Sequence, residues 1–231
     1  MSLQVAAQQF EGLAPDEVIN RVLAAEHGSA CMTCSFQIED MVVLHLLCKR
    51  LPRVPVLFLE TGYHFAETYA YRDRMTKAWN LNLVNVMPTQ SVTEQETELG
   101  ILYRTDPTAC CQRRKVEPLM KALEPFDLWF TGLRREQSAT RRSLGLVEAH
   151  RLPTGKELTK VSPLAAWSWK QVWSYAAEHG IEYLPLYDAG YRSIGCEPCT
   201  AIPAEGADPR SGRWGGNKLE CGIHTISKRF E

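Results

Sequence analysis

The sequence of 231 residues lacks long apolar runs and any marked excess of charge of one sign. No window approaches the roughly 20 consecutive apolar residues that a membrane-spanning helix needs, so we expect no association with a membrane. The first residues have no basic stretch followed by an apolar one, so we expect no secretory signal and a cytoplasmic location. A formal net charge of -1 argues against a general nucleic-acid binder, which usually carries a strong basic excess.

Internal repeats and low-complexity runs are also missing from the sequence. The composition is unlike that of collagen, coiled coils or disordered chains, and 45% of the residues are hydrophobic. That fraction is enough for a full core without disulfide bonds. The length suits one large domain.

Helical and strand patterns alternate along the chain. Helices are predicted over residues 16–26, 39–51, 65–79, 110–123 and 167–179, and strands over residues 30–35, 54–59, 83–87 and 127–131. This alternation predicts a single α/β domain with a parallel, twisted sheet flanked by helices. From residue 187 onward Gly, Pro and charged residues dominate, which predicts an irregular C-terminal segment near the same edge of the sheet.

Polar and small residues follow several of the predicted strands. Ser35, Thr61 with Gly62, and residues 131–132 all come after a strand, and ligands in such sheets bind at the carboxyl ends of the strands. The backbone N–H groups of residues 35–40 could cradle an anion at a helix N-terminus. This loop lacks the glycines of a typical phosphate loop, so the signal is weak by itself.

The eight cysteines need an explanation other than disulfides in a reducing compartment. A tandem pair, Cys110 and Cys111, and a CxxC pair, Cys196 and Cys199, supply the four thiolates that either a [4Fe–4S] cluster or a structural zinc requires. Neighbouring helical side chains point about 100° apart, so a tandem pair reaches one small ion poorly. The pattern therefore favours the cluster and leaves zinc as the alternative. Cys31, Cys34 and Cys48 are interpreted as core thiols.

Two basic features lie close to these motifs in the sequence. Lys115 follows Cys111 by four residues, which places it on the same helix face, beside an anionic cluster. The stretch 131–142 follows a strand and carries four arginines, which match phosphate and sulfate oxygens well: Arg134, Arg135, Arg141 and Arg142. We expect an anion pocket there, with a solvated basic surface as the alternative.

One unpaired cysteine, Cys221, lies near the end of the chain, after a glycine-rich stretch. A mobile, partly exposed thiol beside a cation such as His224 would have a lowered pKa and be nucleophilic. The alternative is a disordered tail with an incidental cysteine.

Taken together, these motifs resemble a known family. The sequence resembles the iron–sulfur-cluster type of assimilatory adenylyl-sulfate (APS) reductases, relatives of the phosphoadenylyl-sulfate (PAPS) reductases. The matching pieces run in family order across nearly the whole chain: SFQIEDMV at 35–42, LETG at 59–62, CCQRRK at 110–115, TGLRREQSATR at 131–141, GCEPCT at 195–200, residues 210–214 and ECGIH at 220–224.

The resemblance implies an adenine-nucleotide α-hydrolase-like fold. It implies a nucleotide-binding domain over residues 1–205, which carries one [4Fe–4S] cluster, and a flexible C-terminal segment over 206–231. Adenylyl sulfate would lie at the carboxyl edge of the sheet. The nucleotide would be held by Ser35, Thr61 and Gly62, and the phosphate and sulfate by Arg134, Arg135, Arg141, Arg210 and Arg213.

The resemblance also implies a reaction in sulfate assimilation and cysteine biosynthesis. Cys221 would attack the sulfur, release AMP and form an S-sulfocysteine, from which thioredoxin or a similar dithiol would release sulfite. Lys115 would link the cluster electrostatically to the charged end of the substrate. A homo-oligomer is compatible with the family.

Three alternatives stay open. The first is the same reaction on PAPS or on both nucleotides. The second is an ATP-dependent adenylating enzyme of the same fold, although Phe36 and Gln37 replace the two glycines of its pyrophosphate loop. The third is a non-catalytic metal-binding module, for which Cys221 would be dispensable.

Overall fold

The centre of the molecule is a six-stranded sheet in the computed structural model, which describes residues 8–25, 28–216, 218 and 220–224. The strands are β1 (Ala30–Thr33), β2 (Pro55–Leu59), β3 (Asn82–Val86), β4 (Leu128–Phe130), β5 (Val147–Arg151) and β6 (Glu157–Val161). Their order in the sheet is β3-β2-β1-β4-β6-β5. All neighbouring pairs are parallel except β5 and β6, which are antiparallel.

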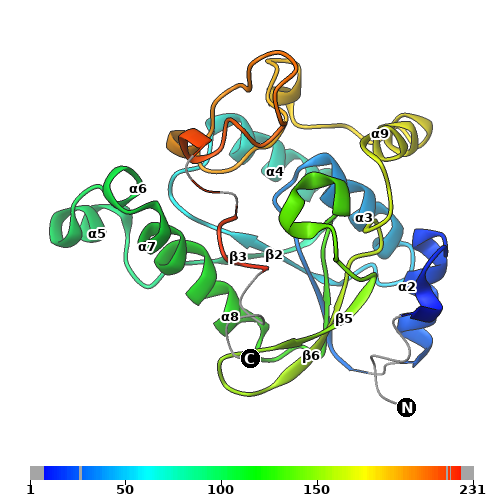
Figure 1. Cartoon of the computed structure of the whole chain (residues 1–231). Coiled ribbons are helices and arrows are strands. Elements are labelled where there is room, and N and C mark those ends of the chain that lie inside the picture. The colour runs from blue at the N-terminus through cyan, green and yellow to red at the C-terminus, as the bar shows by residue number, and fades with distance from the viewer. Residues whose placement is uncertain (1–7, 26–27, 217, 219, 225–231) are drawn as a thin grey trace.

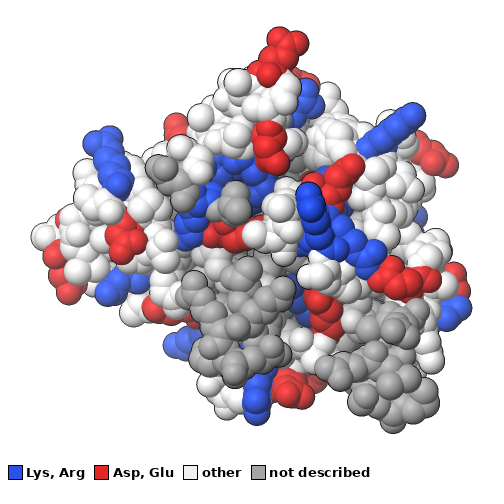
Figure 2. Space-filling model, viewed as in Figure 1, with Lys and Arg blue, Asp and Glu red and all other residues white. Residues whose placement is uncertain are grey.

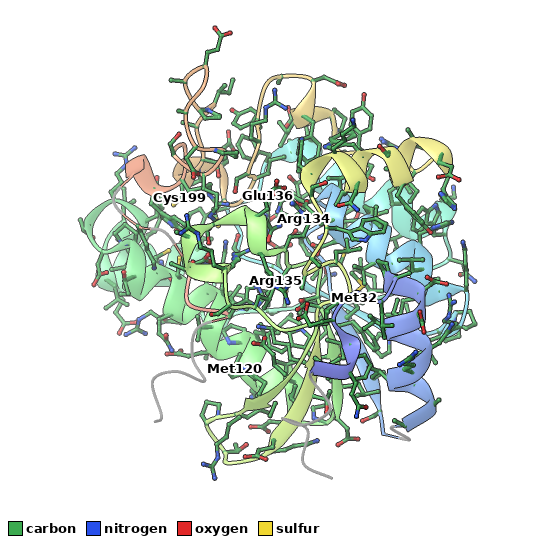
Figure 3. All side chains as sticks on the ribbon, turned by 45° about the vertical axis from the view of Figure 1, so that its right-hand side comes forward. Met32, Met120, Arg134, Arg135, Glu136 and Cys199 are labelled. Carbon is green, nitrogen blue, oxygen red and sulfur yellow. The ribbon has the colours of Figure 1, made fainter. Side chains whose placement is uncertain are left out.

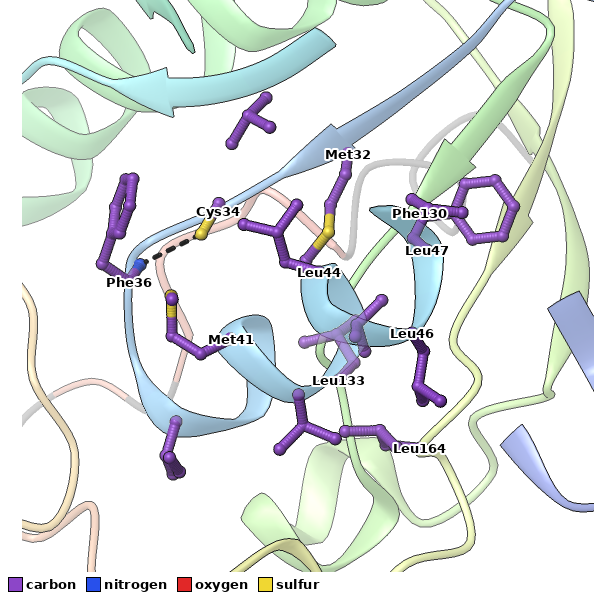
Figure 4. Packing of buried hydrophobic residues seen from close by; sticks show 14 of the residues in the cluster. Met32, Cys34, Phe36, Met41, Leu44, Leu46, Leu47, Phe130, Leu133 and Leu164 are labelled. Carbon is purple, nitrogen blue, oxygen red and sulfur yellow. Dashed lines mark hydrogen bonds between the residues drawn. The ribbon is translucent and has the colours of Figure 1, made fainter. Parts of the chain in front are cut away.

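Helices cover both faces of the sheet (Figure 1). They are α2 (Pro15–Ala25), α3 (Ile38–Cys48), α4 (Ala66–Ala78), α5 (Val92–Leu99), α6 (Leu102–Thr105), α7 (Pro107–Cys111), α8 (Glu117–Leu123) and α9 (Trp169–Glu178). The larger core lies on the face covered by α2, α3, α4 and α9. Figure 4 shows Leu44 of α3 beside Met32 of β1 in this core. Among the described helices, none is long and apolar enough to cross a membrane.

A second core lies on the opposite face of the sheet, under α8. Leu119 and Leu123 of α8 pack there with Trp129 of β4. Cys221 and Ile223 of the C-terminal segment join the same core, and Figure 1 shows this segment crossing beside α8. The C-terminal segment is therefore anchored on the α8 side of the sheet.

The α/β domain with a mostly parallel sheet is confirmed. One predicted helix is divided, however, and several elements were not predicted. The single helix predicted over 110–123 is three segments, because a π-helical turn (Gln112–Val116) separates α7 from α8. The β5–β6 hairpin and the helices α5 and α6 were not predicted. Each hairpin strand mixes charged with apolar residues and is stabilised by pairing with its neighbour, which short-range periodicity does not detect.

Between Pro185 and the last described residues the chain forms only short 3₁₀ turns, which confirms the irregular C-terminal segment. The proposed division at residues 205 and 206, and the mobility of the second part, stay predictions.

Candidate active site

A cavity of about 870 Å³ opens at the carboxyl ends of β1, β2 and β4. Residues 33–35, 57–59 and 131–134 form one side, and the C-terminal segment forms the other. The volume is that of a site for a ligand of nucleotide size. The sheet therefore places its ligand site where a parallel α/β fold is expected to have one.

Basic side chains dominate the charged lining of this cavity, and Figure 2 shows Lys and Arg atoms in the hollow at the middle of that face. They are Lys115, Arg134, Arg141, Arg192, Arg210 and Arg213. Arg134 is already neutralised, since its guanidinium lies 2.9 Å from Glu39 and 2.8 Å from Glu136. Figure 3 shows Arg134 and Glu136 together on the turn that follows β4. Arg192, which the sequence analysis did not select, is exposed at the rim.

The loop after β1 uses part of its hydrogen-bonding capacity internally. The N–H and hydroxyl of Ser35 each donate to Asp40 Oδ2 at 2.6 Å, and the N–H of Ile38 donates to the Tyr187 hydroxyl at 3.2 Å. Burial raises the pKa of Asp40 to about 6. Gly132 permits this packing, because a Cβ there would lie 2.3 Å from Asp40 Oδ1. The N–H of Phe36 donates to Cys34 Sγ at 3.4 Å, so three of the N–H groups expected to cradle an anion are bonded to protein groups.

The same loop carries a strained residue. Phe36 has a φ of 60°, a conformation that costs a non-glycine residue roughly 1–2 kcal/mol. Its buried ring packs edge-on against Phe58 and Tyr71, with centroid distances of 5.8 and 6.3 Å. The ring contacts hold the turn that brings Ser35 to the cavity.

Three of the predicted substrate ligands do not line the large cavity. Arg135 donates to the carbonyl of Leu144 at 2.7 Å and pairs with Glu11. Gly62 packs against Val92, since a Cβ there would lie 2.5 Å from that side chain. Thr61 is buried and accepts a hydrogen bond from the Cys196 thiol at 3.4 Å. Because these residues follow strands, they lie near the carboxyl edge of the sheet. Their place in the sequence does not decide which way each side chain points.

The four predicted cluster ligands meet in a second, smaller cavity. Its lining includes Lys115, Arg213 and all four thiols: Cys110, Cys111, Cys196 and Cys199. The first pair ends α7, and the second flanks a short turn that is held to the loop after β2 by the Glu197 N–H, which donates to the carbonyl of Tyr63 at 2.7 Å. The structure therefore brings the tandem pair and the CxxC pair together in one cavity, and their role as cluster ligands stays a prediction.

The donor set of this cavity fits an iron–sulfur cluster. Four thiolates with three nearby cations, Arg114, Lys115 and Arg213, suit an anionic cluster bound at separate irons. A zinc site needs its sulfurs about 2.3 Å from one point. No group of three or more His, Cys, Asp or Glu within the described residues is arranged to hold a metal ion. The preference for a cluster over zinc therefore rests on the tandem spacing of Cys110 and Cys111.

Charge affects the thiols of this cavity differently. Burial raises the pKa of Cys110 to about 12 and that of Cys199 to about 11. Burial also acts on Cys196, but Lys115, Thr61 and Arg213 outweigh it, so the pKa of Cys196 is lowered. The most easily ionised of these three thiols is therefore the one that Lys115 contacts.

The unpaired thiol of Cys221 lines the large cavity and is half-buried. It lies within electrostatic range of Lys115, Arg213 and Arg210. Lys115 and Arg213 also line the thiol cavity. The two cations therefore stand between the predicted cluster and the predicted nucleophile.

His224 also lines the large cavity but differs from the expectation. Its ring stacks on Trp129 with a centroid distance of 5.5 Å and an angle of 21°. Burial, together with the charge of Lys160, lowers the pKa of His224 well below its usual range. His224 is therefore a neutral anchor on the sheet and not the cation beside Cys221 that the sequence suggested.

One buried charged residue beside Cys221 was not selected from the sequence. Glu220 accepts from Arg141 at 2.9 Å (Nε) and 2.7 Å (Nη2), and Arg210 lies 3.7 Å away. Hydroxyls of Ser138 and Thr140 donate to the same carboxylate at 2.9 Å. Burial alone would raise the pKa of Glu220, but these arginines and Ser138 lower it to about 2. The sequence offered one signal for Glu220: it is an acidic residue next to a predicted nucleophile, in a segment expected to face several arginines.

A parallel α/β sheet with a cationic cavity of nucleotide size at its carboxyl edge defines the class of nucleotide-binding α/β folds. Residues 29–202 match the family model described as "Phosphoadenosine phosphosulfate reductase domain". The chain belongs to this family, which confirms the resemblance seen in the motifs.

Individual relatives agree with the family assignment. The chain is 43% identical over 228 residues to a phosphoadenosine 5'-phosphosulfate reductase of Gloeobacter violaceus, covering 96% of this chain and 93% of that protein. It is 46% identical over 198 residues to an adenosine 5'-phosphosulfate reductase of Mycobacterium tuberculosis, covering 83% and 77%. The PAPS reductase structure from Candida auris is 25% identical, with a TM-score of 0.72 over 86% of this chain and 95% of that one.

Proposed function

We propose that the protein reduces adenylyl sulfate to sulfite and AMP through an S-sulfocysteine at Cys221, in assimilatory sulfate reduction. The observation that carries this proposal is the position of the Cys221 thiol in the cationic cavity, beside Lys115 and Arg213. Relatives named adenosine 5'-phosphosulfate reductase at 46% identity support the substrate. The protein is then a thiol-dependent oxidoreductase of a cytoplasmic pathway.

In the first step, the Cys221 thiolate attacks the sulfur of adenylyl sulfate. The new S–S bond forms as the S–O bond to the phosphate breaks, so AMP leaves with the electron pair and Cys221 carries a sulfonate. Both reactants are anions, so cations directed at the sulfonate oxygens are required to offset their repulsion. Lys115 and Arg213, which line the cavity near Cys221, would supply these cations.

In the second step, a dithiol of the thioredoxin type releases sulfite. One of its thiolates attacks the Cys221 sulfur, the S–S bond to the sulfonate breaks, and sulfite leaves with the electron pair. The second thiol of the dithiol then resolves the mixed disulfide. The dithiol ends as a disulfide, the Cys221 thiolate is restored, and the two electrons reside on sulfite.

The [4Fe–4S] cluster belongs to the same proposal, held by Cys110, Cys111, Cys196 and Cys199. When bound, it supplies an anionic partner for the cations at the base of the large cavity. Lys115 and Arg213 hold positive charge between the two cavities, and both act electrostatically on Cys196. The cavity lined by the four thiols therefore sets how these two side chains are oriented toward the substrate.

One specific observation favours a second candidate substrate. The relative from Gloeobacter violaceus, which covers almost the whole chain, is named for the 3'-phosphorylated nucleotide. Rates of AMP or 3'-phospho-AMP release from the two nucleotides, at equal concentration with the same dithiol, decide between them. We expect the unphosphorylated nucleotide to react faster, because the family resemblance links the set of four paired cysteines to adenylyl sulfate as the substrate.

The decisive experiment mixes the anaerobic, cluster-loaded protein with adenylyl sulfate and no dithiol. Intact mass spectrometry should show one added sulfonate, which peptide mapping places on Cys221, with one AMP released per chain. Cys221→Ser should form no adduct, release no AMP and still bind AMP. Release of AMP without an adduct would rule out this nucleophile, and turnover of ATP without a reductant would point to the adenylating alternative.

The partner and the assembly state are part of the proposal in a general form. We propose a thioredoxin-like dithiol as the partner and allow for a homo-oligomer. Light scattering of the loaded protein measures the second point directly.

A further inference from the structure

Arg141 was expected to bind the substrate, but in the structure it pairs with other side chains of the protein. Its Nε and Nη2 donate to the two carboxylate oxygens of Glu220, at 2.9 and 2.7 Å, and its Nη1 donates to Gln137. Both side chains of the pair are only 11% exposed. A guanidinium engaged on both forks has no bidentate face left for a phosphate or sulfate.

Glu220 collects more than one partner. Ser138 and Thr140 donate to its carboxylate from the same turn as Arg141, and Arg210 lies 3.7 Å from it. The turn between β4 and β5 thus forms a receptor for one carboxylate from the C-terminal segment. A geometry with several charge-assisted hydrogen bonds to one group restrains that group in position as well as stabilising it.

The restrained residue is the immediate neighbour of the nucleophile. Consecutive Cα atoms are about 3.8 Å apart, so a carboxylate held on Arg141 limits where the Cys221 thiol can lie. On the other side of Cys221, Ile223 packs into the core under α8 and His224 stacks on Trp129. Cys221 is therefore held between a polar anchor and an apolar anchor.

We propose that Glu220 is a positioning residue, whose carboxylate docks the C-terminal segment on Arg141 and thereby seats the Cys221 thiol in the cavity. This inference rests on the proposed function and reassigns Arg141 from the substrate to the segment. The sulfonate of the substrate is left to Lys115 and Arg213, which lie beside Cys221.

Charge supports this assignment. An unpaired carboxylate next to Cys221 would repel an anionic substrate. Pairing with Arg141 cancels that charge, so the cavity keeps its positive character where the thiol lies. The competing interpretation is that Glu220 merely occupies a substrate site, from which the phosphate or sulfate of the nucleotide displaces it.

The test compares the wild type with Glu220→Gln, Glu220→Ala, Arg141→Ala and the double variant Glu220→Ala/Arg141→Ala. Single-turnover formation of the Cys221 sulfonate at saturating adenylyl sulfate measures seating of the thiol. The dissociation constant of AMP measures the nucleotide site. Alkylation of Cys221 by iodoacetamide, followed by peptide mass spectrometry, measures its exposure. Glu67→Ala, on the exposed side of α4, is the control.

If Glu220 positions the thiol, each single variant slows sulfonate formation by roughly 10- to 100-fold, as expected for loss of a charge-assisted pair. The AMP dissociation constant stays within about twofold of the wild type, alkylation of Cys221 becomes faster, and the double variant is no slower than the slower single variant. Iron content and the melting temperature should match those of Glu67→Ala.

The inference is overturned if Glu220→Ala transfers the sulfonate at the wild-type rate, or if it binds AMP more tightly while Arg141→Ala binds it more weakly. Those results would make Glu220 a displaceable occupant of the substrate site. If the wild type forms no sulfonate adduct at all, the proposed function fails. Alkylation then still decides the docking: unchanged exposure of Cys221 in Glu220→Ala would refute it, and faster alkylation would support it.

Discussion

The ammonium group of Lys115 lies within electrostatic range of the sulfur of Cys196, in a buried position between the two cavities. Burial alone would lower the pKa of Lys115, but the thiols of Cys196, Cys221 and Cys111 outweigh it and raise that pKa. The side chain lies on the π-helical turn, a feature that often marks functional sites. One buried cation is therefore shared by predicted cluster ligands and the predicted nucleophile.

Lys115→Gln removes this charge and keeps a polar side chain. We expect sulfonate transfer to Cys221 to slow by roughly 100-fold, the range seen when a donor to developing negative charge is lost. Single-turnover mass spectrometry measures the rate, and Lys121→Gln on the exposed side of α8 is the control. A wild-type rate in Lys115→Gln would show that this cation does not serve the reaction.

Gly195→Ala tests the placement of Arg213. A Cβ at residue 195 would lie 2.0 Å from Arg213 Nη2, so the guanidinium must move away from the cavity. We expect kcat/KM for adenylyl sulfate to fall by about tenfold or more, because a charge near the sulfonate is displaced. Steady-state assays measure it. Gly155→Ala, outside the cavity, strains a turn with a φ of 88° but its added methyl meets nothing within 4 Å, so it should lower stability and keep the activity.

Arg114→Met tests how the thiol cavity is held together. The buried Arg114 donates to the carbonyls of Thr61 at 2.5 Å and Gln90 at 3.2 Å, and to the side chain of Gln95 at 3.1 Å. Loss of these bonds leaves buried acceptors unpaired, so we expect the free energy of unfolding to fall by about 3 kcal/mol. Anaerobic urea denaturation measures this.

The matched control for that change is its sequence neighbour. Arg113 is exposed on the same turn, so Arg113→Met should alter the free energy of unfolding by less than about 0.5 kcal/mol. Equal losses in the two variants would contradict the role assigned to Arg114.

His150 makes stability depend on pH. Its buried ring lies 5.0 Å from Trp129 and faces Lys160 and His224, and burial followed by the charge of Lys160 lowers its pKa to about 4. In the unfolded chain this histidine takes up a proton as the pH falls below about 6.5, whereas in the folded chain it stays neutral down to about pH 4. The contribution of the neutral ring to the free energy of unfolding is therefore present above pH 6.5 and is lost as the pH falls toward 4.

The expected loss from His150 is about 2 kcal/mol between pH 6.5 and 4.5. Urea denaturation across this range should show a shallower pH dependence for His150→Phe than for the wild type. Parallel curves for the two proteins would mean that His150 is not buried in its neutral form.

Much of the architecture followed from local patterns. The apolar runs of β2 and β4 and the helical spacing in α2 and α9 were visible in the sequence because each element buries one face or one stretch. The π-helical turn was not, since its residues have ordinary helical propensity and the widened turn accompanies the burial of Arg114 and Lys115. The β5–β6 hairpin depends on pairing between strands, which periodicity within either strand does not record.

The candidate site was predicted in its chemistry but not in its orientation. The tandem pair and the CxxC pair meet in one cavity, and Cys221 lies in the next, as expected. Arg135 and Thr61 carry suitable groups but turn to other partners, Glu11 in one case and Cys196 in the other. A turn can direct adjacent side chains to opposite sides, so the residue type alone does not show which one faces a ligand.

The sequence alone determined which groups the protein has to work with: four paired thiols, a separate cysteine near the end, and a cationic stretch after a strand. Only the tertiary structure decided which cations remain for a substrate and which are neutralised. Arg134 pairs with Glu39 and Arg141 with Glu220, across separations of 95 and 79 residues. Ion pairs of that range form because the folded backbone brings distant segments together in a buried, low-dielectric site, and no local pattern encodes that proximity.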